Sequence, residues 1–266
     1  MNNFITTLPQ QNEIGIIIVA TNAYSVLGIN FIKRFSHYYV GNHNIKFYFF
    51  SDLNPVEYLP DYINISHIYT ENKKWHIGNN LRFECVISLK EKCNSKYLYY
   101  FDADTNVNKI FTEDWFLGDM VGGQHFSDQG SMKEIKGYER NQKSKAYIPH
   151  NTKLPQMYYY GAFWGGKKEN VFKFCEIIQK NRLIDINNSY NPPYNEKYIN
   201  HYFHYNPPTK IVMNKDFMFN ISTKCGIGNP RYIDLNIDNI KNDLLKNKNK
   251  NTDIINGCVV IIKKLD

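Results

Sequence analysis

Near its middle the sequence reads Tyr97-Leu-Tyr-Tyr-Phe-Asp-Ala-Asp104, a short apolar and aromatic run that ends in two aspartates. A run of this length, bounded by polar residues, is typical of a strand that is buried on both faces of a sheet. In open α/β sheets, ligands bind beyond the carboxyl ends of the strands. Asp102 and Asp104 are therefore predicted to face a ligand at that edge of the sheet.

Similar apolar runs lie on both sides of this strand. Three precede it and two follow it, at residues 14–20, 46–52, 65–69, 119–123 and 158–164. Segments with apolar residues at helical spacing lie among them, at residues 24–38, 79–93, 171–178 and 197–204. Because strands and helices alternate, the pattern predicts an α/β fold with a mostly parallel sheet and helices on both faces.

Length and charge set the outer limits. We expect the 266 residues to form a single domain with three parts. Residues 13–110 form a nucleotide-binding half, residues 111–225 a donor-sugar and acceptor half, and residues 226–266 a basic C-terminal tail. The net charge of +7 suits anionic ligands or peripheral contact with an anionic membrane surface. No nucleic-acid-binding motif is present, so no nucleic-acid partner is expected.

Cysteine usage and the N-terminal residues bear on location. The five cysteines are odd in number and form no CxxC pair, which favours free, buried thiols in a reducing compartment. No apolar run approaches the ~20 residues that span a membrane, and the N-terminus does not read as a signal peptide. We therefore expect a cytoplasmic protein without a transmembrane segment.

The two aspartates suit a divalent metal. In an extended chain, residues i and i+2 project to the same side, so both carboxylates can address one ion. Oxygen ligands of this kind suit Mn²⁺ or Mg²⁺, which a diphosphate can also coordinate. Such an ion would stabilise the charge on a departing nucleoside diphosphate. The alternative is an Asp-X-Asp triplet in a solvated surface turn.

Several segments together resemble glycosyltransferase family 6, which contains the α1,3-galactosyl- and N-acetylgalactosaminyltransferases, including the blood-group A and B enzymes and bacterial relatives. The resemblance runs from about Ile14 to about Phe217. Besides Asp102-Ala-Asp104, the matching segments are His37–Gly41, Phe47–Asp52, Tyr138–Pro149, Tyr158–Gly166 and Pro208–Lys210.

This resemblance implies a GT-A type fold, a Rossmann-like mixed sheet flanked by helices. It also implies a retaining, metal-dependent transfer of a hexose from a UDP-sugar to an oligosaccharide or lipid-linked glycan in α1,3 linkage. Some bacterial members replace both aspartates by asparagine, whereas this chain keeps Asp102 and Asp104.

The resemblance also assigns nucleotide-binding positions. Val19, Ala20, Thr21 and Tyr24 match the end of the first strand, which holds uridine in the family, and Ala103 lies between the two aspartates. Tyr24 could stack on uracil, or it could start the buried face of a helix.

A tryptophan and an arginine of the family have counterparts in Trp75 and Arg82. Trp75 is assigned to the donor-sugar and acceptor site. Arg82 could hold the diphosphate or the donor sugar, or it could be a helix-surface arginine.

The sugar-binding positions of the family fall on His125, Ser127, Tyr160, Gly161 and Ala162. His125 could contact the acceptor, or it could be a structural histidine. Ser127 and Ala162 match the B enzyme, where the A enzyme has glycine. A methyl side chain crowds the space that an acetamido group needs, so both positions favour UDP-galactose over UDP-N-acetylgalactosamine.

Glu196 is the catalytic candidate, because the family has a glutamate at this position beside the anomeric carbon. It could be the nucleophile of a double displacement, or it could support a same-face substitution electrostatically. A surface glutamate at a helix start is the alternative. The family has Trp-His-Asp before this glutamate, whereas this chain has Pro193-Tyr194-Asn195, which leaves the acceptor open. The resemblance assigns Asn195 to the donor-sugar and acceptor site, where it replaces a charged aspartate but can still hydrogen-bond as an amide.

Two other functions fit parts of the sequence. The short Asp102–Thr105 segment also resembles glycosyltransferase family 8, whereas the Tyr138–Pro149 segment favours family 6. A non-catalytic carbohydrate-binding protein would use its many aromatic residues to stack on sugars. The paired aspartates argue against that function, because sugar binding alone does not need a diphosphate-bound metal.

Overall fold

The computed structural model describes residues 12–71, 75–105, 107, 109–125, 137–150, 152, 157–190, 195–212, 245, 246 and 248, with only the backbone of residue 23 and of residues 75–80. In these residues seven strands form one sheet in the order β3-β2-β1-β4-β6-β5-β7. The strands are β1 (Glu13–Val19), β2 (Asn44–Ser51), β3 (Ile65–Tyr69), β4 (Tyr97–Phe101), β5 (Met120–Gln124), β6 (Tyr159–Lys167) and β7 (Lys210–Val212).

The sheet changes direction in its middle. Strands β1 to β4 are parallel to one another, whereas β6 runs antiparallel to β4 and pairs Phe163 with Phe101. A side chain at Gly165 would collide with the Leu98 carbonyl and the Tyr99 ring, so glycine permits the close approach of β6 to β4. The observed fold is α/β with a mixed sheet, as expected.

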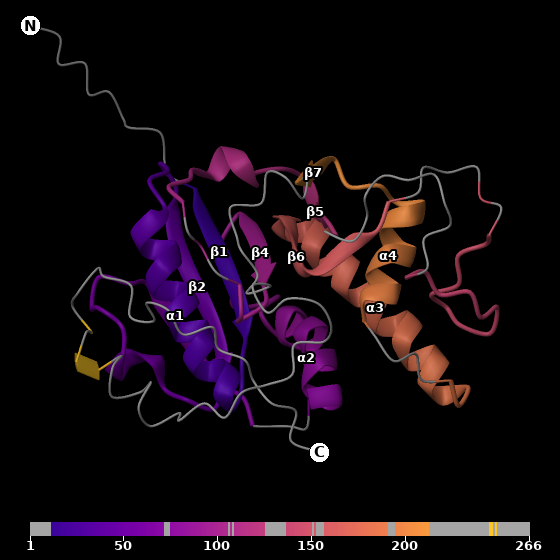
Figure 1. Ribbon diagram of the computed structural model, residues 1–266, viewed down its shortest axis with the longest axis horizontal. Helices are drawn as coiled ribbons and strands as arrows, with labels where there is room; N and C mark the ends of the chain where they lie inside the picture. Colours follow the sequence, from indigo (N-terminus) through magenta and orange to yellow (C-terminus); the bar gives the residue numbers. More distant parts are fainter. Residues whose placement is uncertain are drawn as a thin grey trace, which may run out of the picture.

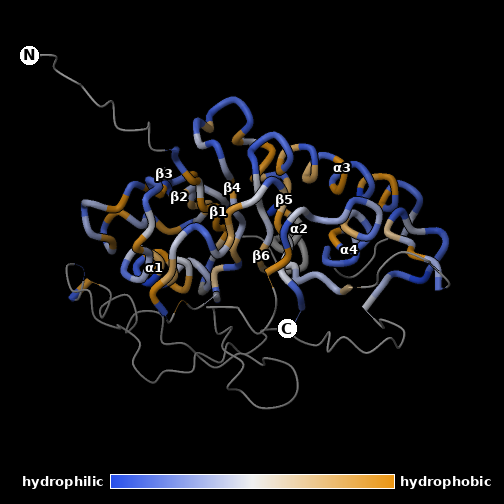
Figure 2. The backbone as a smooth tube through the Cα atoms, turned by 90° about the horizontal axis from the view of Figure 1, so that it is seen from above, coloured by the Kyte–Doolittle hydropathy of each residue, from blue (hydrophilic) through white to orange (hydrophobic). Residues whose placement is uncertain are grey.

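The helices are α1 (Ala23–Tyr38), α2 (Trp75–Ser88), α3 (Lys168–Asn187) and α4 (Glu196–Tyr205), with short 3₁₀ turns η1 (Pro55–Glu57) and η2 (Glu113–Trp115). In Figure 1, α1 lies over the parallel half of the sheet, and α3 and α4 lie beside β6 at the other end. Hydrophobic segments concentrate in the central strands, and hydrophilic segments concentrate in the outer loops (Figure 2).

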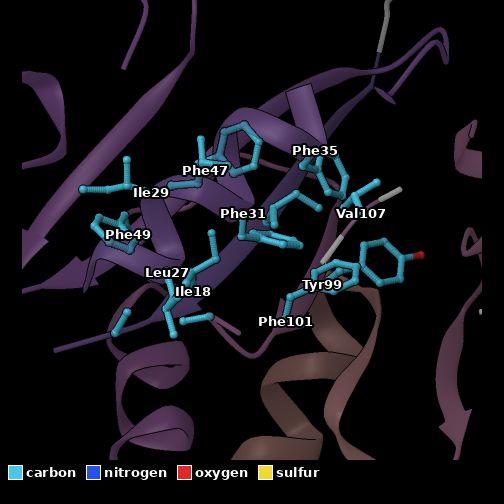
Figure 3. Close-up of a cluster of buried hydrophobic side chains, with 14 of the residues drawn as sticks. Ile18, Leu27, Ile29, Phe31, Phe35, Phe47, Phe49, Tyr99, Phe101 and Val107 are labelled. Carbon is cyan, nitrogen blue, oxygen red and sulfur yellow. The ribbon is translucent and has the colours of Figure 1, made fainter. Parts of the chain in front are cut away.

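Helices cover both faces of the sheet because alternate strand residues point to opposite sides. Ile16 and Ile18 of β1 pack with α1, while Ile17 between them packs in a second cluster with α2, α3 and α4. The first cluster is rich in aromatic rings, among them Phe31 and Phe35 (Figure 3). Burial on both faces explains why β1 reads as a continuous apolar run rather than as an alternating one.

Several predicted boundaries were wrong. The helix predicted at 79–93 runs from Trp75 to Ser88, and turns that end at Cys93 follow it. The helix predicted at 171–178 extends over Lys168–Asn187, because its exposed flanks carry no apolar periodicity. Strand β6 continues three residues beyond the predicted end, and β7 was not predicted.

The cysteine prediction holds where the structure describes the chain. Cys85, Cys93 and Cys175 are buried free thiols, and burial raises the pKa of Cys175 well above its usual value. Cys225 and Cys258 lie outside the described residues, as does the C-terminal tail except residues 245, 246 and 248. Among the helices that the structure describes, none has the length and apolar character needed to cross a membrane.

Candidate active site

The candidate site lies where β4 ends, and β6 and α4 pass beside it. Asp102 directly follows β4, and its backbone N–H donates to the Ala162 carbonyl of β6 at 2.9 Å. A turn closed by the Thr105 N–H and the Asp102 carbonyl, 3.0 Å apart, then carries Asp104. The end of the apolar strand thus fixes the backbone of the aspartate pair against β6.

Arg82 of α2 joins the two sides of the site. Its Nη1 lies 3.2 Å from Asp102 Oδ1 and donates to the Gly161 carbonyl at 2.9 Å. Burial opposes its charge, but nearby acidic groups, Asp102 foremost, raise the pKa of Arg82. Since Arg82 is only 9% exposed, it is not the surface arginine of the alternative prediction.

Tyr100 contacts both Asp102 and Arg82. Its hydroxyl donates to Asp102 Oδ1 at 2.7 Å, and the Arg82 guanidinium lies 5.0 Å from the centre of its ring. The Trp164 ring in turn stacks on the Tyr100 ring, with their centres 4.9 Å apart. These contacts to Asp102 are made through Oδ1, so they leave its second carboxylate oxygen to other ligands.

Asp104 is exposed to solvent, but the surrounding protein atoms displace part of the water that would hydrate its carboxylate. This desolvation, with the neighbouring charge of Asp102, raises the pKa of Asp104 to about 7. Ala103 between them is buried against the hydrophobic core. The turn therefore presents two carboxylates side by side at a cost in electrostatic repulsion that a bound cation would remove.

Glu196 begins α4 and points at β6. Its Oε1 accepts from the Gly161 N–H at 2.6 Å, and its Oε2 accepts from the Tyr158 hydroxyl at 3.0 Å. Burial raises the pKa of Glu196 above its usual value, although these two donors and Arg82 oppose that effect. Glu196 is thus a partly buried, doubly hydrogen-bonded carboxylate and not the solvated surface residue of the alternative.

The rings of His125, Tyr158 and Tyr160 form a cluster, and the Tyr158 hydroxyl connects this cluster to Glu196. The His125 ring lies 5.2 Å from the rings of both Tyr158 and Tyr160, edge-on in each case. Burial, and to a smaller extent the charges of Asp104, Asp102 and Glu196, raise the pKa of Tyr160 well above its usual value. Tyr160 is therefore close enough to all three carboxylates to respond to their charge.

Small residues on β6 make room at the centre of the site. A methyl group at Gly161 would lie 3.2 Å from Glu196 Oε1, a tight contact that glycine avoids. Ala162 is buried. Asn195, which caps α4, is also buried beside Glu196.

The predicted uridine-binding residues lie at the neighbouring strand end. Because Ile17 pairs with Tyr100, β1 and β4 run side by side, and Val19 and Ala20 come at the same edge as Asp102. Thr21 follows in the turn to α1. Tyr24 is partly buried against the hydrophobic core, as its helical alternative predicted.

Asp52 holds this turn, and the sequence did not single it out as a site residue. Both of its oxygens accept from the Asn22 N–H, at 3.0 and 2.9 Å, and Oδ1 also accepts from the Ser25 hydroxyl at 2.6 Å. Asn22 has a positive φ of 57°, a conformation that costs free energy outside glycine. The position of Asp52 directly after β2 was the signal in the sequence that could have identified it.

Two predicted residues cannot be placed. The side chain of Trp75, which begins α2, and all of Ser127 lie outside the described residues, as do Pro193 and Tyr194. The structure therefore brings together Asp102, Asp104, Arg82, Glu196, His125, Tyr160, Gly161 and Ala162. It adds Tyr158, which the sequence indicated only as part of the matching segment Tyr158–Gly166, and Tyr100, which the sequence did not single out.

The donor set fits a divalent ion that is shared with a substrate. Within the described residues, no three His, Cys, Asp or Glu side chains gather closely enough to enclose a metal. Two adjacent carboxylates could hold Mn²⁺ or Mg²⁺ if phosphate oxygens and water complete the coordination, which is how Mg²⁺ commonly binds in phosphate-handling sites.

Comparison with known proteins gives the family. The family model for glycosyltransferase family 6 matches residues 4–231. The chain is 24% identical over 198 residues to the O-antigen biosynthesis glycosyltransferase WbnI of Escherichia coli, covering 73% of this chain and 83% of that protein.

Animal proteins match as well. Globoside alpha-1,3-N-acetylgalactosaminyltransferase 1 of Gallus gallus is 26% identical over 217 residues, which is 77% of this chain and 61% of that protein. Histo-blood group ABO system transferase 1 of Rattus norvegicus is 24% identical over 211 residues, or 76% and 60%. The chain thus spans about three fifths of the length of these two relatives. Since the family model matches most of the sequence, the chain belongs to glycosyltransferase family 6 and is a glycosyltransferase.

Proposed function

We propose that this chain transfers galactose from UDP-galactose to a hydroxyl of a glycan, in α1,3 linkage, with retention of anomeric configuration and with Mn²⁺ or Mg²⁺ bound. The observation that carries the proposal is the line of contacts from Asp102 through Arg82 and Gly161 to Glu196. This line would join the proposed metal site to a carboxylate beside the strand that we propose binds the sugar.

The donor would lie along the sheet edge. Val19, Ala20, Thr21 and Tyr24 would hold the uridine, and Asp102 and Asp104 would hold the metal with the diphosphate. The bound cation would neutralise charge on the departing UDP. Arg82 would add a fixed positive charge that is already oriented by Asp102 and Tyr100.

Glu196 would act at the anomeric carbon. As the bond from that carbon to the UDP oxygen breaks, positive charge develops on the sugar ring, and a nearby carboxylate stabilises it. Both oxygens of Glu196 already accept a hydrogen bond, which weakens it as a nucleophile. We therefore assign it electrostatic support of a same-face substitution.

Galactose is favoured as the donor sugar because Ala162, which is buried beside Gly161, carries a methyl group. An acetamido group in the same place would need that volume. His125 and Tyr160 would face the acceptor glycan, and the name of the bacterial relative, an O-antigen biosynthesis enzyme, agrees with an acceptor of this class.

The test is release of UDP from UDP-galactose, UDP-N-acetylgalactosamine and UDP-glucose by the purified protein, with Mn²⁺ and with chelator. Hydrolysis to water needs no known acceptor. We expect manganese-dependent release that is fastest with UDP-galactose. Asp102→Asn with Asp104→Asn should abolish the metal stimulation, whereas the control Asp61→Asn, at a side chain that is 94% exposed, should not.

If the aspartate double variant keeps its response to Mn²⁺, the metal assignment is wrong. If the protein neither releases UDP from any of the three donors nor binds UDP in the presence of Mn²⁺, the UDP-sugar proposal is wrong.

A further inference from the structure

The first residues of β6, before Phe163, lie beyond the last regular pair with β4, at the place where the site forms. Strand β4 ends with Phe101 opposite Phe163, and β5 shifts its register between Gly122 and Gln124. Backbone N–H and C=O groups that leave a ladder must find other partners, because leaving them buried and unpaired costs free energy.

Side chains of α4 supply hydrogen bonds to this part of β6. Glu196 accepts from the Gly161 N–H at 2.6 Å. Asn200, one helical turn later, accepts from the Tyr159 N–H through Oδ1 at 2.7 Å and donates through Nδ2 to the Tyr159 carbonyl at 2.9 Å. Four helical residues rise about 6 Å and two strand residues about 6.6 Å, so residues i and i+4 of a helix match residues i and i+2 of a strand.

Asn200 also reaches back to the residue that it places. Its Nδ2 donates to the Glu196 carbonyl at 2.8 Å, and its side chain is fully buried. One acceptor and two donors are used at once, which a carboxamide can provide and a carboxylate or hydroxyl of similar size cannot.

We propose that Asn200 is a positioning residue that sets the register of α4 on β6 and thereby the place of the Glu196 carboxylate. The catalytic role of Glu196 in this inference rests on the proposed function. The register of α4 on β6 does not depend on that function. Asn200 would not touch either substrate, and its effect on the reaction would pass through Glu196.

The first test is hydrogen exchange of the Gly161 amide, which needs no activity. In Asn200→Ser, which removes the carboxamide, and in Asn200→Gln, which lengthens its stem by one methylene, we expect the Gly161 amide to lose most of its protection. The matched control is Ile199→Val, a trimmed core residue of the same helix. It should lower the melting temperature and keep Gly161 protected.

The second test is the rate of UDP release. We expect both Asn200 variants to lower kcat about tenfold to a hundredfold, with the KM for UDP-galactose little changed, because the proposed contacts to the uridine and the diphosphate come from β1, α2 and the residues that follow β4. Combined with Glu196→Gln, which by itself should lower kcat strongly, Asn200→Ser should add almost nothing.

Several outcomes overturn the inference. These are full protection of Gly161 in both Asn200 variants, an equal loss of kcat in Ile199→Val, or the same loss from Asn200→Ser with and without Glu196→Gln. If wild-type protein releases no UDP, the proposed function fails while the exchange experiment still decides the register. If Glu196→Gln keeps the wild-type kcat, the positional role in catalysis fails and the donor class stands.

Discussion

At the scale of single residues, the site depends on pairs that meet from distant parts of the chain. Tyr158 and Glu196 are 38 positions apart, and Arg82 and Gly161 are 79 apart, yet both pairs are hydrogen-bonded. Asp102 and Glu196 each accept hydrogen bonds that fix the direction of the carboxylate. This arrangement lets a partly buried carboxylate keep one orientation while the substrate comes and goes.

Donor choice is predicted to depend on the methyl group of Ala162. Ala162→Gly should raise the rate with UDP-N-acetylgalactosamine relative to UDP-galactose by about tenfold, because it opens space for the acetamido group. The measurement is the ratio of kcat/KM for the two donors. An unchanged ratio would mean that other residues limit the size of this pocket.

The protonation of Glu196 is predicted to limit activity at low pH. Its role needs the ionised form, and burial, with the nearby Asp102 charge, raises its pKa. Activity should therefore fall, as the pH is lowered, at a higher pH than an ordinary glutamate would give. The measurement is kcat as a function of pH between 4 and 8. In Glu196→Gln, the residual kcat should no longer show this fall at low pH.

At the scale of elements, segment 137–150 is tied to α3 and α4 by two buried carboxylates. Asp185 of α3 accepts from the Ser144 hydroxyl at 2.7 Å and from the Tyr198 hydroxyl of α4 at 2.8 Å. Glu139 of the segment pairs with Lys197 at 2.9 Å. Lys197 and Tyr198 directly follow Glu196, so the segment braces the start of the helix that carries it.

Removing the Asp185 charge is predicted to destabilise this brace. Asp185→Asn should lower the free energy of unfolding by about 2 kcal/mol. The substitution removes the charge of the acceptor and also the well-aligned hydrogen bonds that the carboxylate accepts from Ser144 and Tyr198. Tyr198→Phe removes one of the donors and should cost about 1 kcal/mol. Urea unfolding measures both, and equal costs for the two variants would contradict the ranking.

A second brace joins the end of α1 to η2 and predicts a pH-dependent stability. Burial would raise the pKa of Glu113, but hydrogen bonds, including those from its own backbone, from His43 and from Tyr39, lower it to about 2. Because the folded pKa is depressed, the stabilisation is present above the unfolded pKa and is lost as the pH falls toward the folded one.

Glu113→Gln should therefore be less stable than wild type by roughly 2 kcal/mol at pH 7, and the gap should shrink between about pH 4.5 and pH 2. Unfolding free energies of both proteins across this range provide the measurement. A gap that stays constant would show that the charge of Glu113 is not its source.

At the scale of the whole molecule, ligand binding should stabilise the fold because the proposed donor contacts come from several elements. With UDP and Mn²⁺ at about a hundred times the dissociation constant, we expect about 2.7 kcal/mol of added stability and a melting temperature that rises by roughly 5 to 10 °C. Chelator should reverse the rise in wild type. The variant with Asp102→Asn and Asp104→Asn should show little rise at the same concentrations.

Much of the fold could be predicted because its strands are apolar runs and α1 is strongly periodic. Strand β1 and helix α1 were placed within two residues of their observed bounds. The antiparallel direction of β6 could not be read from the pattern, since periodicity carries no direction. Strand β7 has three residues, too few to form a pattern.

Some residues of the candidate site could also be predicted from the sequence, and others could not. Asp102 and Asp104 could be found because a buried strand runs straight into them, and Glu196 because of a family resemblance. Asp52 and Asn200 were missed as site residues because each acts through a partner that the fold brings near it, such as Asn22 for Asp52. Tyr100 was missed for another reason, because within its buried strand it reads as one more core residue although Asp102 is only two positions away. Hydrogen bonds between residues 30 or more positions apart leave no local trace in the sequence.

The change of direction between β4 and β6 has a consequence for engineering. The proposed nucleotide contacts lie on the parallel side of this seam, on β1, β4 and α2, and the proposed sugar contacts lie on β6 and α4 across it. Apart from α2, which contains both Arg82 and the predicted sugar-site residue Trp75, the two sets of side chains belong to separate stretches of the chain. A library confined to residues 158–163 could therefore change which sugar is transferred while the enzyme goes on accepting the same nucleotide carrier.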